Sequence, residues 1–210
     1  MWTSSTSTSR ACFRIVAGSD TPQVGVLAIQ GGFEAHAAAL ERLGHRTVEV
    51  RHPAQLEGLE GLVIPGGEST TIAMGIDAAG LVEPIREFAR SGFPVMGTCA
   101  GLIMLDRAHL GLMDIDARRN AFGRQVRSFE ADLVVKGLGD EPIRAVFIRA
   151  PWIDRAGDGV QVLAELEGHP VVARERNLLV AAFHPELTDD LRLHALFLAL
   201  GRGAEQEVPA

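Results

Sequence analysis

The chain has 210 residues, of which 47% are hydrophobic and 22% charged, and its formal net charge is −7. This length favours a single domain, and the hydrophobic content is typical of a packed globule rather than of a disordered or collagen-like chain. The acidic balance disfavours functions that depend on binding a nucleic-acid backbone or an anionic membrane surface. Because no hydrophobic run reaches the roughly 18 residues that a transmembrane helix needs, we expect no membrane span.

The two ends of the chain differ in composition from the rest. Residues 1–21 are rich in Ser and Thr and lack the hydrophobic run and cleavage pattern of a secretory signal, so we expect a disordered leader and a cytoplasmic protein. A single domain is expected over residues 22–202, followed by a polar tail over residues 203–210. The two cysteines, Cys12 and Cys99, belong to no C-x-x-C pair, so we expect no zinc site, and no metal ion or other cofactor is expected.

The first half of the domain alternates strand and helix patterns. Short hydrophobic and β-branched runs predict strands over residues 24–30, 46–52, 61–64 and 93–98. Helical spacing predicts helices over residues 33–43, 81–90 and 100–107, and a further helix capped by Ser69 or Thr70. Strands that alternate with helices of this length form right-handed crossovers and a mostly parallel sheet.

The second half is rich in strands. Strand patterns are found over residues 124–135, 143–148, 160–165, 171–176 and 178–183, and a hydrophobic helix is predicted over residues 191–200. We therefore expect a three-layer α/β domain whose sheet is mixed but mostly parallel, with helices on both faces.

The most specific motif is Gly97-Thr98-Cys99-Ala100-Gly101, between a predicted strand and a predicted helix. It has the G-x-nucleophile-x-G form of a nucleophile elbow, in which small flanking residues allow a sharp turn that exposes the central side chain. The start of the following helix favours a thiolate, and the next backbone N–H can stabilise an oxyanion. Taken alone, the pentapeptide is equally compatible with a buried cysteine in a glycine-rich turn.

His184 and Glu186 are the best candidates for the base and its orienting group. His184 ends a hydrophobic strand, and parallel strands end at the edge of the sheet where the elbow would present Cys99. Glu186, two residues later, can hydrogen-bond the imidazole and fix its tautomer. A carboxylate at the start of a helix is the alternative interpretation of Glu186, and surface or structural roles are expected for the other six histidines.

A third motif, Pro65-Gly66-Gly67-Glu68-Ser69-Thr70, follows a predicted strand and precedes a predicted helix. Its glycines can expose backbone N–H groups as an oxyanion hole or a small anion-binding nest. The lysine and the spacing of a phosphate-binding loop are missing, and a plain turn is the other interpretation.

Together these residues resemble the class I, triad-type glutamine amidotransferases, and within that class the chain is similar to the PdxT/SNO family. That family is the glutaminase subunit of pyridoxal 5′-phosphate synthase. The similarity extends over about Val24 to Leu200. The matching segments are Leu27–Gly31, Pro65–Thr70, Gly97–Ile103, Arg119–Gln125, Phe147–Pro151 and Phe183–Leu187.

The resemblance implies a flavodoxin-like class I glutamine amidotransferase fold and a role for each matching residue. Cys99 would attack the amide of L-glutamine, His184 would act as base and then acid, and Glu186 would orient His184. Backbone N–H groups of Gly67 and Ala100 would form the oxyanion hole. Gln30 and His36 match a loop near the interface with the partner subunit. The implied glutamine-binding residues are Gly67, Glu68, Ser69, Arg119, Ile148 and Arg149.

The implied partner is a barrel-type synthase subunit of the PdxS/SNZ kind, in a large hetero-oligomer, which would receive the ammonia. Two alternatives stay open at this point. The chain could be the glutaminase subunit of another pathway, such as the imidazole-glycerol-phosphate branch of histidine synthesis. It could also be a catalytically silent regulatory domain that keeps the fold.

Overall fold

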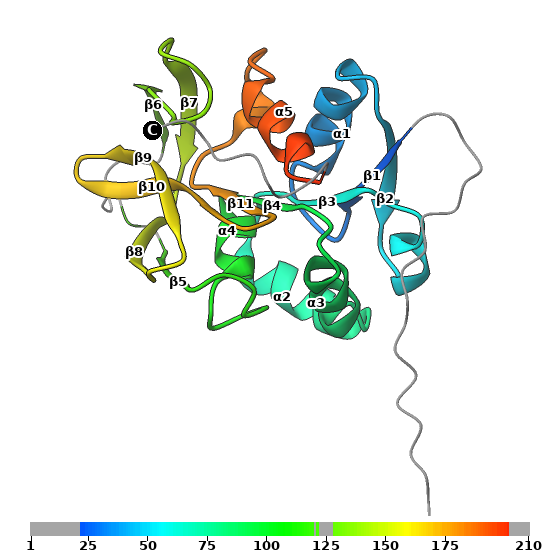
Figure 1. Ribbon diagram of the computed structural model, residues 1–210. Coiled ribbons are helices and arrows are strands. Elements are labelled where there is room, and N and C mark those ends of the chain that lie inside the picture. The colour runs from blue at the N-terminus through cyan, green and yellow to red at the C-terminus, as the bar shows by residue number, and fades with distance from the viewer. Residues whose placement is uncertain (1–21, 120, 122–127, 202–210) are drawn as a thin grey trace, which may run out of the picture.

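A computed structural model of the chain describes residues 22–119, 121 and 128–201 (Figure 1). The predicted leader (residues 1–21), the predicted tail (203–210) and the first part of the strand predicted at 124–135 lie outside the described residues. Elsewhere each predicted strand or helix falls on an observed one, with ends that differ by a few residues.

A seven-stranded sheet forms the middle layer, in the order β2-β1-β3-β4-β11-β10-β9. The first five strands are parallel and in the order of flavodoxin-like sheets, whereas β10 and β9 are antiparallel additions at one side. The expectation of a mixed, mostly parallel sheet is therefore confirmed. The strands, in sheet order, are β2 Arg46–Val50, β1 Gln23–Leu27, β3 Gly61–Ile64, β4 Val95–Thr98, β11 Leu178–Ala181, β10 His169–Glu175 and β9 Gln161–Leu166.

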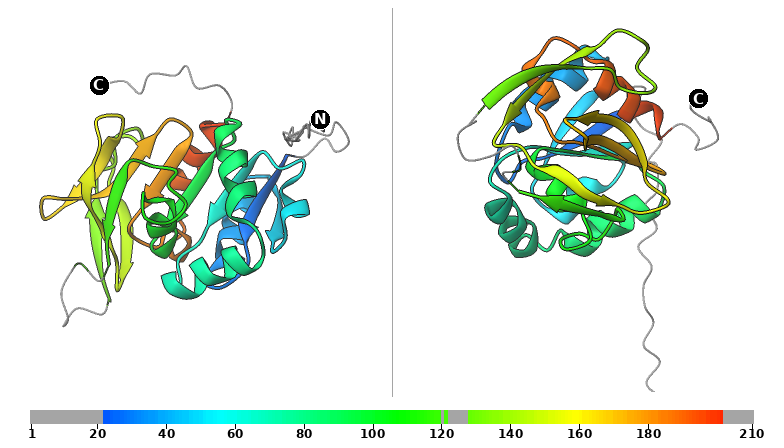
Figure 2. Two further views of the ribbon diagram at one scale, coloured as in Figure 1. Left: turned by 90° about the horizontal axis from the view of Figure 1, so that it is seen from below. Right: turned by 90° about the vertical axis from the view of Figure 1, so that its left-hand side faces the viewer.

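Helices cover both faces of this sheet (Figures 1 and 2). In the view of Figure 1, α1 and α5 lie above the sheet, and α2, α3 and α4 lie below it. This is the three-layer arrangement that alternating strands and helices predict. The helices are α1 Phe33–Arg42, α2 Ser69–Ala78, α3 Val82–Arg90, α4 Ala100–Leu105 and α5 Arg192–Ala199, with short 3-10 helices η1 Pro53–Leu56 and η2 Pro185–Leu187.

Two antiparallel ribbons lie beside the antiparallel end of the sheet (Figure 2). One pairs β6 (Ser128–Leu133) with β7 (Ile143–Ile148), and the other pairs β5 (Ile115–Arg118) with β8 (Trp152–Ala156). β5 and β8 were not predicted, because both are short and half polar and neither forms a hydrophobic run. Each strand pairs with residues that lie between 34 (Arg118 with Trp152) and 41 (Ile115 with Ala156) positions away.

The buried hydrophobic residues form one connected cluster that includes all four largest fully buried side chains, Phe88, Phe147, Phe183 and Phe197. In the described part of the chain no helix is both long enough and apolar enough to cross a bilayer.

Candidate active site

The chemically important residues gather where the parallel strands end. Gln30 follows β1, Gly67 follows β3, Cys99 follows β4 and His184 follows β11. Because β3, β4 and β11 are neighbours in the sheet, the loops that follow them meet at one edge. Ligands bind at this edge in open α/β sheets.

Cys99 lies at a strained turn between β4 and α4. Its φ is 49° and its ψ is −107°, a conformation that non-glycine residues rarely adopt and that occurs at functional sites. A Cβ on Gly101 would collide with the backbone oxygen of Ile64, and a Cβ on Gly97 would collide with the backbone of Gly101. Both flanking glycines are therefore required by the close approach of backbone to backbone, as the elbow motif predicts.

His184 lies beside Cys99 and is held by Glu186. Its Nδ1 lies 2.8 Å from Glu186 Oε1, and its backbone N–H donates to the Val146 carbonyl oxygen. Burial by itself would lower the pKa of His184, but hydrogen bonds to Cys99 and Glu186 raise it to about 10. A protonated imidazole next to sulfur stabilises the thiolate, which is the nucleophilic form of cysteine.

Glu186 is a buried carboxylate whose side chain is only 2% exposed. Burial would raise its pKa, but the charge of His36 and the hydrogen bond to His184 hold this pKa well below its usual range. The carboxylate is therefore ionised and accepts hydrogen bonds only. The Nδ1 proton of His184 is therefore directed at Glu186, and Nε2 faces the sulfur.

The glycine turn after β3 can approach Cys99 and His184 closely because Gly66 has no side chain. A Cβ at Gly66 would lie 2.5 Å from His184 Cε1 and 3.0 Å from Cys99 Cβ. Any side chain there would push the imidazole away from the sulfur. The second glycine, Gly67, packs against the Gln30 side chain, whose Oε1 accepts the Glu68 backbone N–H at 2.7 Å.

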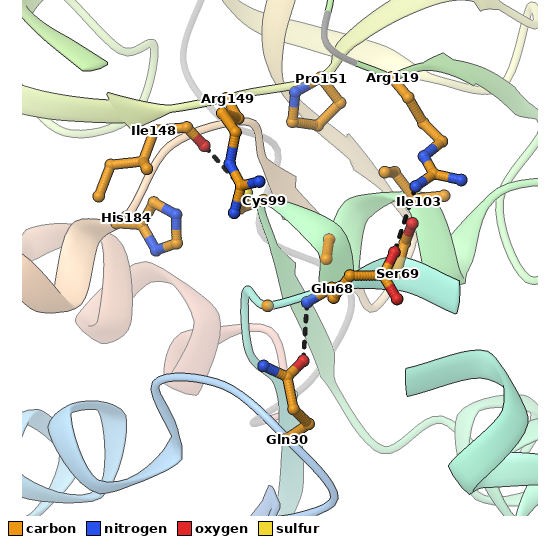
Figure 3. Close-up of a pocket in the computed structure, with 12 residues that line it drawn as sticks. Gln30, Glu68, Ser69, Cys99, Ile103, Arg119, Ile148, Arg149, Pro151 and His184 are labelled. Carbon is orange, nitrogen blue, oxygen red and sulfur yellow. Dashed lines mark hydrogen bonds and ion pairs between the residues drawn. The ribbon is translucent and has the colours of Figure 1, made fainter. Parts of the chain in front are cut away.

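These residues surround one pocket (Figure 3). It contains the predicted nucleophile and base, the two predicted oxyanion donors and all six predicted glutamine-binding residues. The full lining is Gln30, Gly67, Glu68, Ser69, Cys99, Ala100, Ile103, Arg119, Ile148, Arg149, Pro151 and His184. Glu186 lies behind His184 and does not line the pocket.

Glu68 and Arg119 form an ion pair at the pocket, with 3.2 Å between Arg119 Nη2 and Glu68 Oε1 (Figure 3). Glu68 is also the N-cap of α2, because its two carboxylate oxygens accept the backbone N–H groups of Thr70 and Thr71. These hydrogen bonds lower the pKa of Glu68 to about 2. The prediction that Ser69 or Thr70 caps this helix was wrong, since a carboxylate satisfies two donors at once and a hydroxyl only one.

On the opposite wall, β7 ends at the pocket. The carbonyl oxygen of Ile148 lies 3.9 Å from Cys99 Sγ, and Arg149 adopts a positive φ of 46°. The Ile148 carbonyl oxygen therefore faces the Cys99 sulfur across the pocket.

Gly67 and Ala100 each present a backbone N–H that donates to no other residue in the described ranges. Ala100 begins α4, so its N–H is one of the free donors at a helix start. Free donors next to Cys99 are what an oxyanion hole requires.

His36 was expected in a loop near a partner interface; the structure places it in a helix instead, and the interface stays a prediction. The residue lies within α1, is fully buried, and contacts Glu186 from the side away from the pocket. The helix begins at Phe33, directly after the glycine pair, so His36 is one turn into it and faces the sheet.

Two pocket residues were missed from the sequence, Ile103 and Pro151. Ile103 is four positions after Cys99, so helical spacing alone could have placed it on the same face of α4. Pro151 follows the two predicted glutamine-binding residues at the end of β7. Over residues 22–119, 121 and 128–201, no group of three or more His, Cys, Asp or Glu side chains could hold a metal ion.

Known proteins with this arrangement were found by sequence and by structure. Residues 26–200 match the model of the SNO glutamine amidotransferase family. The pyridoxal 5′-phosphate synthase subunit PdxT of Pelotomaculum thermopropionicum is 55% identical, over 84% of this chain and 93% of that protein. The subunit of the same name from Carboxydothermus hydrogenoformans is 52% identical, over 84% of this chain and 96% of its own length.

Solved structures agree with these relatives. A crystal structure of a glutamine amidotransferase is 48% identical with a TM-score of 0.80, and the match covers 85% of this chain and 98% of the other. The structure of PurLQS from Thermotoga maritima, 19% identical with a TM-score of 0.68, shares the fold.

Proposed function

The chain belongs to the SNO glutamine amidotransferase family, and on that basis we propose that it is the glutaminase subunit of a pyridoxal 5′-phosphate synthase. It hydrolyses L-glutamine to L-glutamate and ammonia and delivers the ammonia to a separate synthase subunit. The observation that carries the proposal is the pocket in which Cys99 at a strained elbow meets His184, which Glu186 holds by a 2.8 Å hydrogen bond.

In the proposed reaction, the Cys99 thiolate attacks the side-chain amide carbon of glutamine and forms a C–S bond. The negative charge passes to the amide oxygen, where the Gly67 and Ala100 N–H groups stabilise it. His184 then gives its proton to the amide nitrogen, the C–N bond breaks and ammonia leaves. Water, deprotonated by His184, attacks the γ-glutamyl thioester, and glutamate is released with the thiolate restored.

The polar groups of the pocket suit the backbone end of glutamine. The Arg119 guanidinium matches an α-carboxylate, and the Glu68 carboxylate beside it matches an α-ammonium group. The Ile148 and Arg149 backbone forms the wall nearest the sulfur.

Replacing Arg119 by alanine should raise KM for glutamine by roughly 10- to 100-fold, because a charge-assisted hydrogen bond is worth about 1.5–3 kcal/mol. The change in kcat should be much smaller, since the arginine contacts no reacting atom. Steady-state kinetics of glutamate release measures both constants. Arg118→Ala is the matched control, because Arg118 lies over the Trp152 ring and pairs with Asp154 outside the pocket. An unchanged KM in Arg119→Ala would contradict the proposed carboxylate site.

The proposed function is tested by measuring glutamate release with and without the synthase subunit from the same organism. We expect the partner to stimulate the glutaminase by on the order of tenfold, a usual size for coupling between sites. We also propose that the two proteins form a large hetero-oligomer, which light scattering would detect. Failure of the partner to bind or to stimulate would contradict the assignment to this synthase. Stimulation by the synthase subunit of histidine synthesis instead would assign the chain to that pathway.

A further inference from the structure

A row of buried polar side chains lies behind Glu186, on the side away from the pocket. It consists of His36 on α1, Thr98 at the end of β4 and His194 on α5, and all three residues are fully buried. Buried polar groups are retained where they are hydrogen-bonded to one another. None of the three takes part in the reaction proposed above.

His36 is the centre of this row and contacts the triad directly. Its Nε2 lies 3.2 Å from Glu186 Oε2 and 3.0 Å from Thr98 Oγ1. Its Nδ1 lies 2.9 Å from His194 Nε2. The imidazole therefore connects the orienting carboxylate of the triad to α5 and to the residue just before Cys99.

The two oxygens of Glu186 are divided between two imidazoles. Oε1 accepts from His184, whereas Oε2 makes no hydrogen bond of good geometry within the described residues and has the His36 Nε2 beside it. If His36 were apolar, one oxygen of a buried carboxylate would be left uncompensated. The carboxylate would then gain by turning toward other donors, and His184 would lose its fixed partner.

We propose that His36 is a positioning residue, which holds Glu186 Oε2 so that Oε1 keeps His184 aimed at Cys99, while Thr98 and His194 hold His36 in place. This inference rests on the proposed glutaminase function, since it concerns the orientation of the same base. His36 touches neither the pocket nor the reacting atoms. It acts through Glu186 alone.

His36 can donate a hydrogen bond toward Glu186. Glu186 only accepts, so the His36 Nε2 that faces it carries a proton. Thr98 Oγ1 lies 3.0 Å from the same nitrogen, and His194 Nε2 lies 2.9 Å from His36 Nδ1, so the ring is held from both sides. Burial lowers the pKa of His194 to about 3, so that ring is neutral.

The groups that face His36 are few and come from each element packed against it. They are Glu186 from the loop after β11, Thr98 from β4 and His194 from α5, and Glu186 in turn holds His184. A substitution of His36 therefore changes the surroundings of the Glu186 carboxylate and leaves every other charged side chain in place.

The test compares His36→Leu with His36→Gln. Leucine has a similar size and no donor, whereas the glutamine amide nitrogen occupies about the place of the ring Nε2 and can donate to Glu186. We expect His36→Leu to lower kcat for glutamine hydrolysis by roughly 10- to 100-fold, as the loss of a supporting hydrogen bond does, with KM within about twofold. His36→Gln should recover most of this loss.

A second measurement follows the pH dependence of Cys99 alkylation by iodoacetamide on the chain alone. In the wild type His184 stabilises the thiolate, so alkylation stays fast at low pH. In His36→Leu the fast region should begin at higher pH, and in His36→Gln it should return toward the wild-type range. A merely structural role would leave this profile unchanged in the folded variants.

Leu40→Ala is the matched control for packing, because Leu40 is fully buried on the same helix and is not part of the row. It should lower the thermal unfolding temperature without moving the alkylation profile. If folded His36→Leu has the wild-type profile and kcat, the inference is wrong. If the wild type hydrolyses no glutamine, the proposed function fails, while the alkylation profiles still decide the role of His36.

Discussion

Replacing Cys99 by alanine is expected to lower kcat for glutamine hydrolysis by at least about 10⁴-fold, in the presence of the synthase subunit and in its absence. The γ-glutamyl thioester cannot form without the sulfur, and no other side chain in the pocket is a nucleophile of comparable strength. Binding of glutamine should persist, because Arg119, Glu68 and the Ile148–Arg149 wall are untouched. Coupled assay of glutamate release measures the loss of activity, and calorimetry measures the remaining binding.

Cys12→Ala is the matched control for the loss of a thiol. Cys12 is the other cysteine of the chain and lies in the segment predicted to be a leader. Its replacement should leave kcat unchanged, and only the wild type and this variant should lose activity on treatment with iodoacetamide. If Cys99→Ala hydrolyses glutamine as fast as the wild type, the triad interpretation fails, and the silent-domain alternative gains support.

Local motifs made the reacting end of the site predictable from sequence. The elbow around Cys99 is a pentapeptide whose glycines are needed for close backbone contacts, so the residue pattern alone predicts the sharp turn. His184 could be placed beside it because both residues end parallel strands, and parallel strands end at one edge. For the same reason the glycine turn at Gly66 was predictable, although its contact with the imidazole was not.

The supporting part of the site could not be predicted in the same way. His36 and His194 are 158 positions apart and meet only because α1 and α5 lie on the same face of the sheet. Their sequence neighbourhoods are ordinary amphipathic helices, in which a histidine has no distinctive pattern. The cap of α2 was missed for another reason, because Glu68, Ser69 and Thr70 are all polar and only the structure shows which side chain reaches the free N–H groups.

Replacing Glu186 by glutamine should lower kcat by about 10³- to 10⁴-fold, as the corresponding carboxylate-to-amide change does in other triads. An amide has one acceptor oxygen, whereas the carboxylate accepts from His184 Nδ1 with one oxygen and has His36 Nε2 3.2 Å from the other. If the amide nitrogen faces His184, the imidazole must carry its proton on Nε2 and cannot act as a base. If it faces His36 instead, two N–H groups oppose each other in a buried site.

The same substitution should change how stability depends on pH. The pKa of Glu186 is held below its ordinary value of 4.5, so the ionised carboxylate stabilises the fold above that pH, and this contribution is lost as the pH falls. In Glu186→Gln the fall in unfolding temperature that protonation of this carboxylate causes at low pH should disappear from thermal unfolding curves. Asp189→Asn is the control, because Asp189 is almost fully exposed and pairs with Arg42 at the surface. An active Glu186→Gln variant with the wild-type pH dependence would show that the carboxylate neither orients His184 nor is buried as an anion.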